Sequence, residues 1–185
     1  MAQVLKDEIR EKILNAALQE FFEKGYKSAA MRNIAEIAKI PTGLIYSYYK
    51  NKETLFDEVL RPVNYNWYAV LSSADVNHKN EPKDLSNAER KCLLNLLDHR
   101  KEFIIMVDKS QGTKYENQKE EIISITENHL NNHVSVAEYD PILIHIVANN
   151  FVEGLLQIMY HYKNKKWAVE MLNKISYMYF RGIGL

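Results

Sequence analysis

Residues 31–52, MRNIAEIAKIPTGLIYSYYKNK, constrain the fold of this chain more than any other segment. Two short stretches with apolar residues at helical spacing meet at a break, KIPTG, over residues 39–43. The second stretch carries polar and aromatic side chains outside its apolar positions and runs toward two lysines. This pattern is typical of a helix-turn-helix, whose second helix enters the major groove of DNA.

Helical periodicity continues on the N-terminal side of this motif. Apolar residues three and four apart predict a first helix over about residues 6–24. A short second helix follows over residues 31–38, and a third over about residues 42–49. Together these segments predict a three-helix DNA-binding domain over residues 1–52.

Single residues indicate where these helices begin and end. Gly25 ends the first helix. Asn51 is a good N-cap for a fourth helix that starts directly after it. Pro62 should kink that helix or stop it near Leu60, because proline removes a backbone donor and clashes with the preceding turn. The fourth helix therefore links the first domain to a second one, over residues 53–185.

The remainder of the chain predicts further helices only. Residues 72–84 are polar and contain Pro82, so they are expected to form a loop. Five apolar-periodic stretches follow and predict helices over about residues 85–99, 101–109, 114–134, 140–162 and 165–181. We therefore expect an all-α protein of about nine helices, with an N-terminal helix-turn-helix domain and a larger C-terminal helical bundle.

The composition favours a soluble, cytoplasmic protein. Hydrophobic residues make up 46% of the 185 positions, which is enough for a substantial core. The single Cys92 fits a reducing cytosol. No apolar run reaches the roughly 18 residues of a membrane span, and the charged N-terminus lacks the apolar stretch of a signal peptide. No association with a membrane is expected.

The charge is balanced overall but unevenly distributed. Lys and Arg number 24, as do Asp and Glu, so the formal net charge is zero. Residues 25–52, however, hold five cationic residues and only Glu36 as an acidic one, a local charge of +4 that leaves −4 for the rest of the chain. Attraction to a polyanion depends on such local patches, so this distribution favours binding to nucleic acid.

Residues 25–55 contain a set of residues that is typical of one known family. The set is Gly25–Tyr26, Ile34–Ala35, Ala38, Gly43, Ile45–Tyr46, Tyr48, and Lys52 followed by Leu55. On these residues the segment resembles the DNA-binding domain of the TetR (tetracycline-repressor) family of transcriptional regulators, and the similarity covers about residues 8–58. The resemblance implies a ligand-responsive repressor that binds a palindromic operator in double-stranded DNA as a homodimer.

The chain differs from the family pattern at three places, which are the start of the second helix, the turn and the residue before the third helix. The family usually has Thr or Ser at the start of the second helix, where this chain has Ala29 and Ala30. A capping hydroxyl worth about 1 kcal/mol is therefore missing, unless Ser28 replaces it. Lys39 stands where the turn usually has Gly, and Pro41 replaces a common Ser. These differences affect individual phosphate contacts rather than the fold.

The outer side of the third helix and its flanks form the predicted DNA-reading surface, with Ile45 and Tyr49 pointing inward. Hydroxyl and methyl groups near its N-terminus can contact base edges, while tyrosine and lysine side chains and the amides at the start of the fourth helix can reach phosphates. The alternative is a three-helix core with a solvated basic rim, but two exposed phenol rings so close together weigh against it. The predicted DNA-binding residues are Arg32, Thr42, Gly43, Leu44, Tyr46, Ser47, Tyr48, Lys50 and Lys52.

The last two helices carry more apolar surface than one face of a small bundle needs. The resemblance implies that they pair with their symmetry mates in a four-helix dimer interface. A twofold dimer also suits a palindromic site whose half-sites lie about 34–36 Å apart. The alternative is an ordinary monomeric core. The predicted interface residues are Phe151, Gly154, Leu155, Ile158, Met171, Ile175 and Met178.

The resemblance also implies a pocket for an unknown small-molecule effector, between the helices that span about residues 85–160. Ligand binding would favour a conformer whose recognition helices no longer match the spacing of the major grooves, with the bend near Pro62. For each candidate the alternative is core packing or a solvated surface. The candidates are Trp67, Tyr68, Leu96, Phe103, Met106, Tyr115, Asn149, Asn150 and Glu153.

Other functions have little support in the sequence. His129 and His133 lie four residues apart, but no cysteine or suitably spaced carboxylate completes a metal site, so a solvated helix face is favoured. Motifs for a nucleophile, a phosphate loop or a metalloprotease are missing, so neither an enzyme nor a cofactor is expected. The competing hypothesis is a helical ligand-binding or scaffolding protein with a vestigial DNA-binding head.

Overall fold

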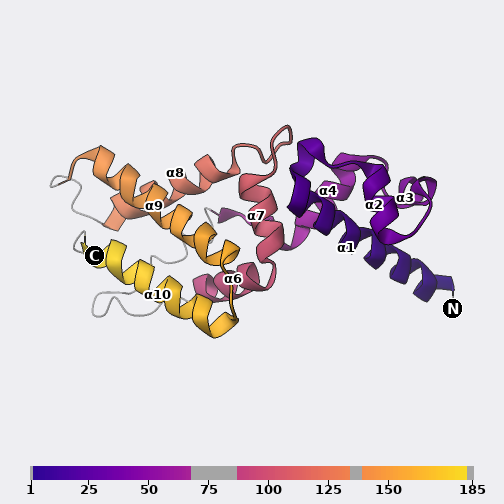
Figure 1. The fold of residues 1–185 in the computed structure, drawn as a ribbon. Helices are drawn as coiled ribbons and strands as arrows, with labels where there is room; N and C mark the ends of the chain where they lie inside the picture. Colours follow the sequence, from indigo (N-terminus) through magenta and orange to yellow (C-terminus); the bar gives the residue numbers. More distant parts are fainter. Residues whose placement is uncertain (1, 68–86, 134–138, 183–185) are drawn as a thin grey trace. The chain divides into compact units, whose positions relative to one another are not determined.

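The computed structural model describes residues 2–67, 87–133 and 139–182. In these ranges the chain forms nine α-helices and one short 3-10 helix, and no strand (Figure 1). The prediction of an all-α fold with about nine helices is therefore confirmed. The loop predicted over residues 72–84 lies outside the described residues.

The chain divides into two compact units. The first combines residues 1–64 with residues 101–116, and the second combines residues 65–100 with residues 117–185. The chain therefore passes between the units three times. The first unit contains more of the chain than the DNA-binding domain predicted over residues 1–52.

α1 (Ala2–Ser28) is a long helix with one interruption. At Gly25 the backbone has φ 71° and ψ 163°, a conformation that side-chain-bearing residues rarely adopt, so regular helix ends there as predicted. Beyond it, the Ala29 amide donates to the Gly25 carbonyl at 3.0 Å and closes one further turn. The buried side of α1 includes Ile13 and Phe21, neither of which has exposed surface.

α2 (Met31–Ala38) and α3 (Thr42–Tyr48) form the predicted helix-turn-helix. Both helices are short, so their stability comes from packing rather than from their own hydrogen bonds. Ile34 of α2 and Ile45 of α3 have no exposed surface, and Met31 is 9% exposed. The apolar positions read from the sequence are therefore the positions that attach the motif to the core.

The turn between these two helices lies at Lys39, whose backbone is in the left-handed region, with φ 57° and ψ 45°. Its amide donates to the Glu36 carbonyl at 3.1 Å, and the Ile40 amide donates to the Ala35 carbonyl at 3.1 Å. This pair of bonds is the Schellman arrangement that commonly ends a helix, usually with glycine at the left-handed position.

Replacing Lys39 with glycine should raise the free energy of unfolding by about 0.5–1 kcal/mol, because glycine adopts the left-handed region without steric cost. Thermal unfolding followed by circular dichroism measures the change. Lys50→Gly, at an exposed position beyond the motif, serves as the control and should not stabilise the protein. A lower melting temperature for Lys39→Gly would contradict this account of the turn.

α4 (Lys52–Leu60) begins at the predicted N-cap. The Asn51 side chain accepts from the Thr54 amide at 2.8 Å, and the Thr54 hydroxyl accepts from the Asn51 amide at 3.2 Å, which forms a capping box. α4 ends at Leu60, directly before the 3-10 turn η1 (Arg61–Val63) that contains Pro62. Of the two outcomes expected at Pro62, a kink or a stop near Leu60, the structure shows the stop.

An aromatic cluster joins three segments of the first unit. Phe56 of α4 has no exposed surface, and its ring centroid lies 4.9 Å from that of Phe21, 4.8 Å from that of Tyr26 and 6.2 Å from that of Tyr115. Tyr115 lies in the segment that follows α7 (Arg100–Asp108). The cluster therefore holds this distant segment against α1 and α4.

Hydrogen bonds fasten the same segment to the first unit. The Tyr26 amide donates to the Lys109 carbonyl at 2.8 Å, and the Lys109 ammonium donates to the Phe22 carbonyl at 2.6 Å. Lys114 pairs with Asp57 of α4 at 2.8 Å. The unit extends beyond residue 52 because α4 and the segment after α7 share a core with α1, a contact that helical periodicity does not predict.

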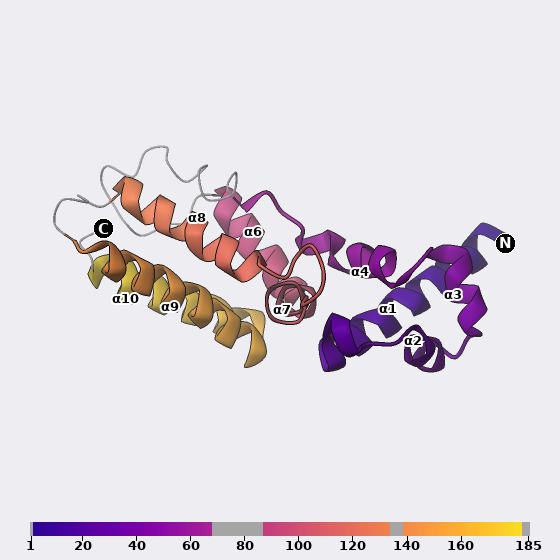
Figure 2. The ribbon, with the colours of Figure 1, turned by 90° about the horizontal axis from the view of Figure 1, so that it is seen from above.

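The second unit contains α6 (Asn87–Asp98), α8 (Gln118–His133), α9 (Pro141–Tyr160) and α10 (Lys165–Gly182). α9 lies antiparallel beside both α8 and α10 (Figure 2). Its buried side chains include Ala148 and Leu156, which have no exposed surface. The helices predicted in this part of the chain agree with the observed ones within a few residues.

α9 corrects one expectation from the sequence. It is 20 residues long with a mean hydropathy of 1.5, so by length and composition alone it qualifies as a membrane span, although no such run was expected. The core helix of a water-soluble protein passes the same test, and 44% of its apolar window is buried against the rest of the chain. The histidine and asparagines between its apolar residues make the run less obvious in the sequence.

Candidate nucleic-acid interface

The recognition helix α3 buries one side and exposes the other. Ile45 has no exposed surface and Tyr49 is 8% exposed, so both point inward as predicted. Tyr46 is 51% exposed, and Gly43 and Ser47 are exposed as well. A Cβ built on Gly43 would meet no atom within 4 Å, so another molecule can approach the backbone closely there.

The remaining predicted residues of this helix lie at the edge of the exposed side. Thr42, Leu44 and Tyr48 are half-buried, and Lys50 just beyond the helix is exposed. The Ser47 hydroxyl donates to the Leu44 carbonyl at 2.7 Å, so its oxygen keeps the capacity to accept a bond from outside. The structure thus brings these residues to one surface, and their contact with DNA stays a prediction.

Arg32 of α2 is highly exposed, with 84% of its side chain accessible. Its Nε lies 3.4 Å from Oε1 of Glu36, one helical turn away. Exposed pairs of this kind contribute only a few tenths of a kcal/mol. A phosphate can therefore replace Glu36 as the partner of Arg32 at little cost.

Lys52 differs from the prediction. Its ammonium donates to the Tyr26 carbonyl at 2.7 Å and to the Ala29 carbonyl at 2.9 Å, and it lies 4.4 Å from the centre of the Tyr26 ring. Burial lowers the pKa of this ammonium from its ordinary value. Because the charge is directed into the protein, the side chain is not placed to bind a phosphate, and only the backbone at the start of α4 keeps that option.

Glu20 is a candidate that the sequence motif does not contain. It is 3% exposed on α1, and its Oε1 accepts from the Ala30 amide at 3.2 Å and from Asn33 Nδ2 at 2.9 Å. Ala30 is the N-cap residue of α2 and has no side-chain cap. Glu20, rather than Ser28, therefore supplies the acceptor at this helix start. The only signal in the sequence is an acidic residue on the apolar stripe of α1.

A polar hollow lies where the start of α1 meets the end of α3. Arg10 pairs with Glu58 of α4 and donates to the Tyr49 hydroxyl at 3.4 Å, so one cation ties α1 to both neighbours. α1 thus places cationic side chains beside the recognition helix, which the motif alone does not predict. The hollow is lined by Lys6, Asp7, Arg10, Ser47, Tyr48 and Tyr49.

The residues predicted for an effector pocket fall in both units. Asn150 is exposed, and Glu153 is half-buried with partners: its carboxylate accepts from Lys119 at 2.9 Å and from Gln157 at 2.8 Å. The bond from Lys119 lowers the pKa of Glu153. Neither residue is therefore an unpartnered polar group in the core. Phe103, Met106 and Tyr115 belong to the first unit, Trp67, Leu96, Asn149, Asn150 and Glu153 to the second, and Tyr68 lies outside the described residues.

The predicted dimer interface needs correction at three positions. Leu155 and Ile158 are 6% and 4% exposed, so they belong to the core of the second unit. A Cβ on Gly154 would lie 3.1 Å from Cδ1 of Ile175, so the close approach at this glycine is to α10 of the same chain. Helical spacing identifies apolar residues but does not tell which of them face the chain's own core.

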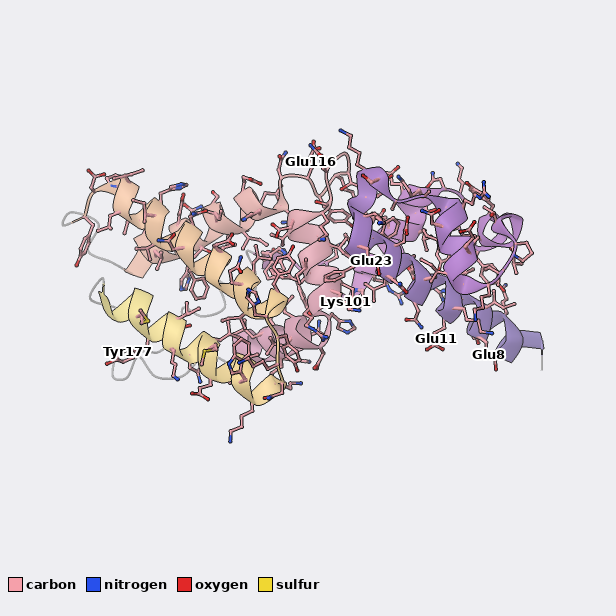
Figure 3. The ribbon with its side chains drawn as sticks, viewed as in Figure 1. Glu8, Glu11, Glu23, Lys101, Glu116 and Tyr177 are labelled. Carbon is pink, nitrogen blue, oxygen red and sulfur yellow. The ribbon has the colours of Figure 1, made fainter. Side chains whose placement is uncertain are left out.

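A different set of apolar side chains is exposed on the α9–α10 pair. Ile142 and Ile146 of α9 are 58% and 45% exposed, and Tyr177 and Met178 of α10 are 60% and 72% exposed. Tyr177 projects away from α10 (Figure 3). Because the two helices are antiparallel, the start of α9 and the end of α10 lie at the same end of the pair. Phe151, Met171 and Ile175 are half-buried.

The fold and this surface define a helix-turn-helix protein with a separate helical unit. Residues 13–59 match the family described as bacterial regulatory proteins, tetR family. This match and the relatives below, which are named as transcriptional regulators, place this segment of the chain in the TetR family.

Similar proteins support this assignment over different lengths. The chain is 47% identical over 47 residues to the uncharacterized HTH-type transcriptional regulator YhgD of Bacillus subtilis, a quarter of each protein. It is 24% identical over 191 residues to the HTH-type transcriptional regulator QacR of Staphylococcus aureus, covering 95% of this chain and 98% of that one. A TetR-like transcriptional regulator from Rhodococcus sp. RHA1 has the same fold, with a TM-score of 0.59 at 17% identity over 94% and 96% of the two chains.

The stronger sequence matches are confined to part of each relative. In the first three curated relatives, the alignment spans between a quarter and about half of their length.

Proposed function

We propose that this protein is a transcriptional regulator, most simply a repressor, that binds double-stranded DNA through α3. The observation that carries the proposal is the exposed side of α3. Tyr46, Ser47 and the open backbone at Gly43 are presented outward on a helix that Ile45 fastens to the core. A recognition helix needs this combination of rigid attachment and exposed polar groups.

The charge of this region supports the same function. The segment 25–52 carries +4 on a chain of zero net charge, and Lys50 and Arg32 are exposed cations beside α3. Cationic side chains near phosphates supply sequence-independent affinity. This affinity falls as the salt concentration rises, because binding releases counterions from the DNA and their release is less favourable in concentrated salt. We place the protein in the cytoplasm, where such DNA is accessible, and assign it no catalytic role.

The exposed apolar side chains of α9 and α10 favour a homodimer. A palindromic operator presents two equivalent half-sites, and a twofold dimer presents two equivalent recognition helices. We assign the interface to the face that carries Ile142, Ile146, Tyr177 and Met178. Each of these side chains stays in contact with water unless a second copy covers it.

A small-molecule effector bound in the second unit would regulate the DNA-binding unit. The chain passes between the two units at residues 64–65, 100–101 and 116–117, so three covalent connections couple them. The first connection directly follows η1, which makes the turn at Pro62 a place where a change of angle can occur.

A binding experiment tests the proposed function. Duplexes selected from a random library for binding to the unaltered protein are titrated in fluorescence anisotropy at several salt concentrations. Replacing Tyr46 and Lys50 together with alanine should weaken binding at least about tenfold and reduce the salt slope by about 0.9. Lys91→Ala, an exposed lysine of α6, is the control and should change neither.

The same experiment distinguishes the competing hypothesis. A vestigial DNA-binding head would yield no duplex after selection, or a duplex whose affinity is unchanged by the Tyr46 and Lys50 replacements. Either result would contradict the assignment of α3 as the reading helix.

A further inference from the structure

One peptide bond at the junction of α1 and α2 is held from both sides by charged groups. Its carbonyl, on Ala29, accepts from the Lys52 ammonium at 2.9 Å. Its amide, on Ala30, donates to the Glu20 carboxylate at 3.2 Å. The two charges come from α1 and α4, so this single peptide unit connects both helices to the start of α2.

Each of the two charged side chains also makes a second hydrogen bond, Lys52 to the end of α1 and Glu20 to the start of α2. Lys52 also donates to the Tyr26 carbonyl at 2.7 Å, near the end of α1. Glu20 also accepts from the side chain of Asn33 at 2.9 Å, in the first turn of α2. Lys52 therefore fixes the chain that leaves α1, and Glu20 fixes the chain that enters α2.

The junction needs such support because α2 has no cap of its own. The N-cap position is occupied by Ala30, whose backbone is extended, with φ −123° and ψ 136°, as N-cap residues usually are. An alanine side chain offers no acceptor there. A carboxylate placed at a helix start also interacts favourably with the helix dipole.

The direction of α2 determines where α3 is presented. α2 has eight residues and is therefore about 12 Å long, so a change of about 10° at its start moves its far end by about 2 Å. Recognition sites tolerate displacements of only about 0.5 Å. A small rotation at the Ala29–Ala30 peptide would therefore displace the DNA-reading surface by more than a recognition site tolerates.

We propose that Glu20 and Lys52 are positioning residues that clamp the Ala29–Ala30 peptide and thereby set the orientation of α2 and α3 for DNA binding. This inference rests on the proposed function. In this proposal the Glu20 carboxylate supplies the hydrogen-bond acceptor that a capping hydroxyl would otherwise provide at the start of α2. It also assigns to Lys52 a contribution to DNA affinity that involves no phosphate.

The salt dependence of binding separates this role from a phosphate contact. Losing a phosphate contact reduces the slope of log affinity against log salt by about 0.9, whereas losing the orientation of α3 lowers affinity at every salt concentration without that change. In the anisotropy titration with the selected duplex, Glu20→Ala and Lys52→Met should each bind at least about tenfold more weakly with the slope of the unaltered protein.

Two sets of variants serve as controls. Lys50→Met replaces an exposed lysine two residues away and should reduce the slope. Lys52→Arg and Glu20→Gln keep a donor and an acceptor, so both should bind within about threefold of the unaltered protein. These conservative variants keep the test informative if Lys52→Met does not fold.

A rescue variant tests the capping role directly. Ala30 is exposed, so a serine fits there and supplies an N-cap hydroxyl. The double variant Glu20→Ala with Ala30→Ser should recover most of the affinity lost in Glu20→Ala. Without DNA, amide hydrogen exchange at Ala30 should be at least about tenfold faster in Glu20→Ala than in the unaltered protein.

The outcomes are distinct. Unchanged affinity and unchanged exchange at Ala30 in Glu20→Ala would overturn the clamp. A slope reduced by about 0.9 in Lys52→Met would make Lys52 a phosphate contact instead. Failure to select any duplex with the unaltered protein would contradict the proposed function itself, whatever the exchange at Ala30.

Discussion

Replacing Phe56 with alanine should lower the free energy of unfolding of the first unit by about 3–5 kcal/mol. Phe56 has no exposed surface, and its ring meets those of Phe21, Tyr26 and Tyr115. The replacement leaves a cavity at the point where α1, α4 and the segment after α7 meet, and it removes three aromatic contacts at once.

Hydrogen exchange of the amides in α1 and α4 measures this loss for the first unit alone, and thermal unfolding measures it for the whole chain. Tyr46→Ala removes an aromatic ring that is 51% exposed in the same unit, so its effect should stay within about 0.5 kcal/mol. A loss below about 1 kcal/mol in Phe56→Ala would show that the aromatic cluster is not the core of the unit.

Replacing Ile146 and Met178 together with glutamate should convert the protein from a dimer to a monomer. Both side chains are exposed on the α9–α10 pair, at 45% and 72%, so the replacements leave the core of the chain intact. In a dimer they would bring like charges into an apolar interface, where neither charge has a partner. Affinity for a palindromic duplex should then fall about 100-fold or more, because the two half-sites are no longer linked.

Sedimentation equilibrium at micromolar concentration measures the change in assembly. Asn131→Glu, at an exposed position of α8, is the control and should leave the dimer intact. A monomer in the unaltered protein would contradict the dimer, and a persistent dimer in the double variant would place its interface elsewhere.

The helices were predictable because each is encoded locally. Gly25 ends regular helix through its own backbone angles, and Asn51 caps α4 through a residue three positions away. The inward direction of Ile45 and Tyr49 follows from helical spacing alone. The outward set on α3 follows in the same way, which is why the predicted DNA-reading surface lies on one side of that helix.

Burial of apolar residues was harder to assign in the second unit. α9 is apolar around most of its circumference, so its sequence does not distinguish the side that faces α8 and α10 from the side that faces water. Leu155 and Ile158 therefore looked equivalent to Ile142 and Ile146, although the first two are core residues and the others are exposed.

The sequence by itself determined the helix-turn-helix, the ends of its helices and the residues that α3 presents, because these depend on contacts within a few positions of the chain. Only the tertiary structure decided the roles of Glu20 and Lys52 and the membership of residues 101–116 in the first unit. Their partners lie between 10 and 87 positions away. A charged side chain in the sequence carries no sign of whether it faces water or a backbone group, since that is settled only when distant helices pack together.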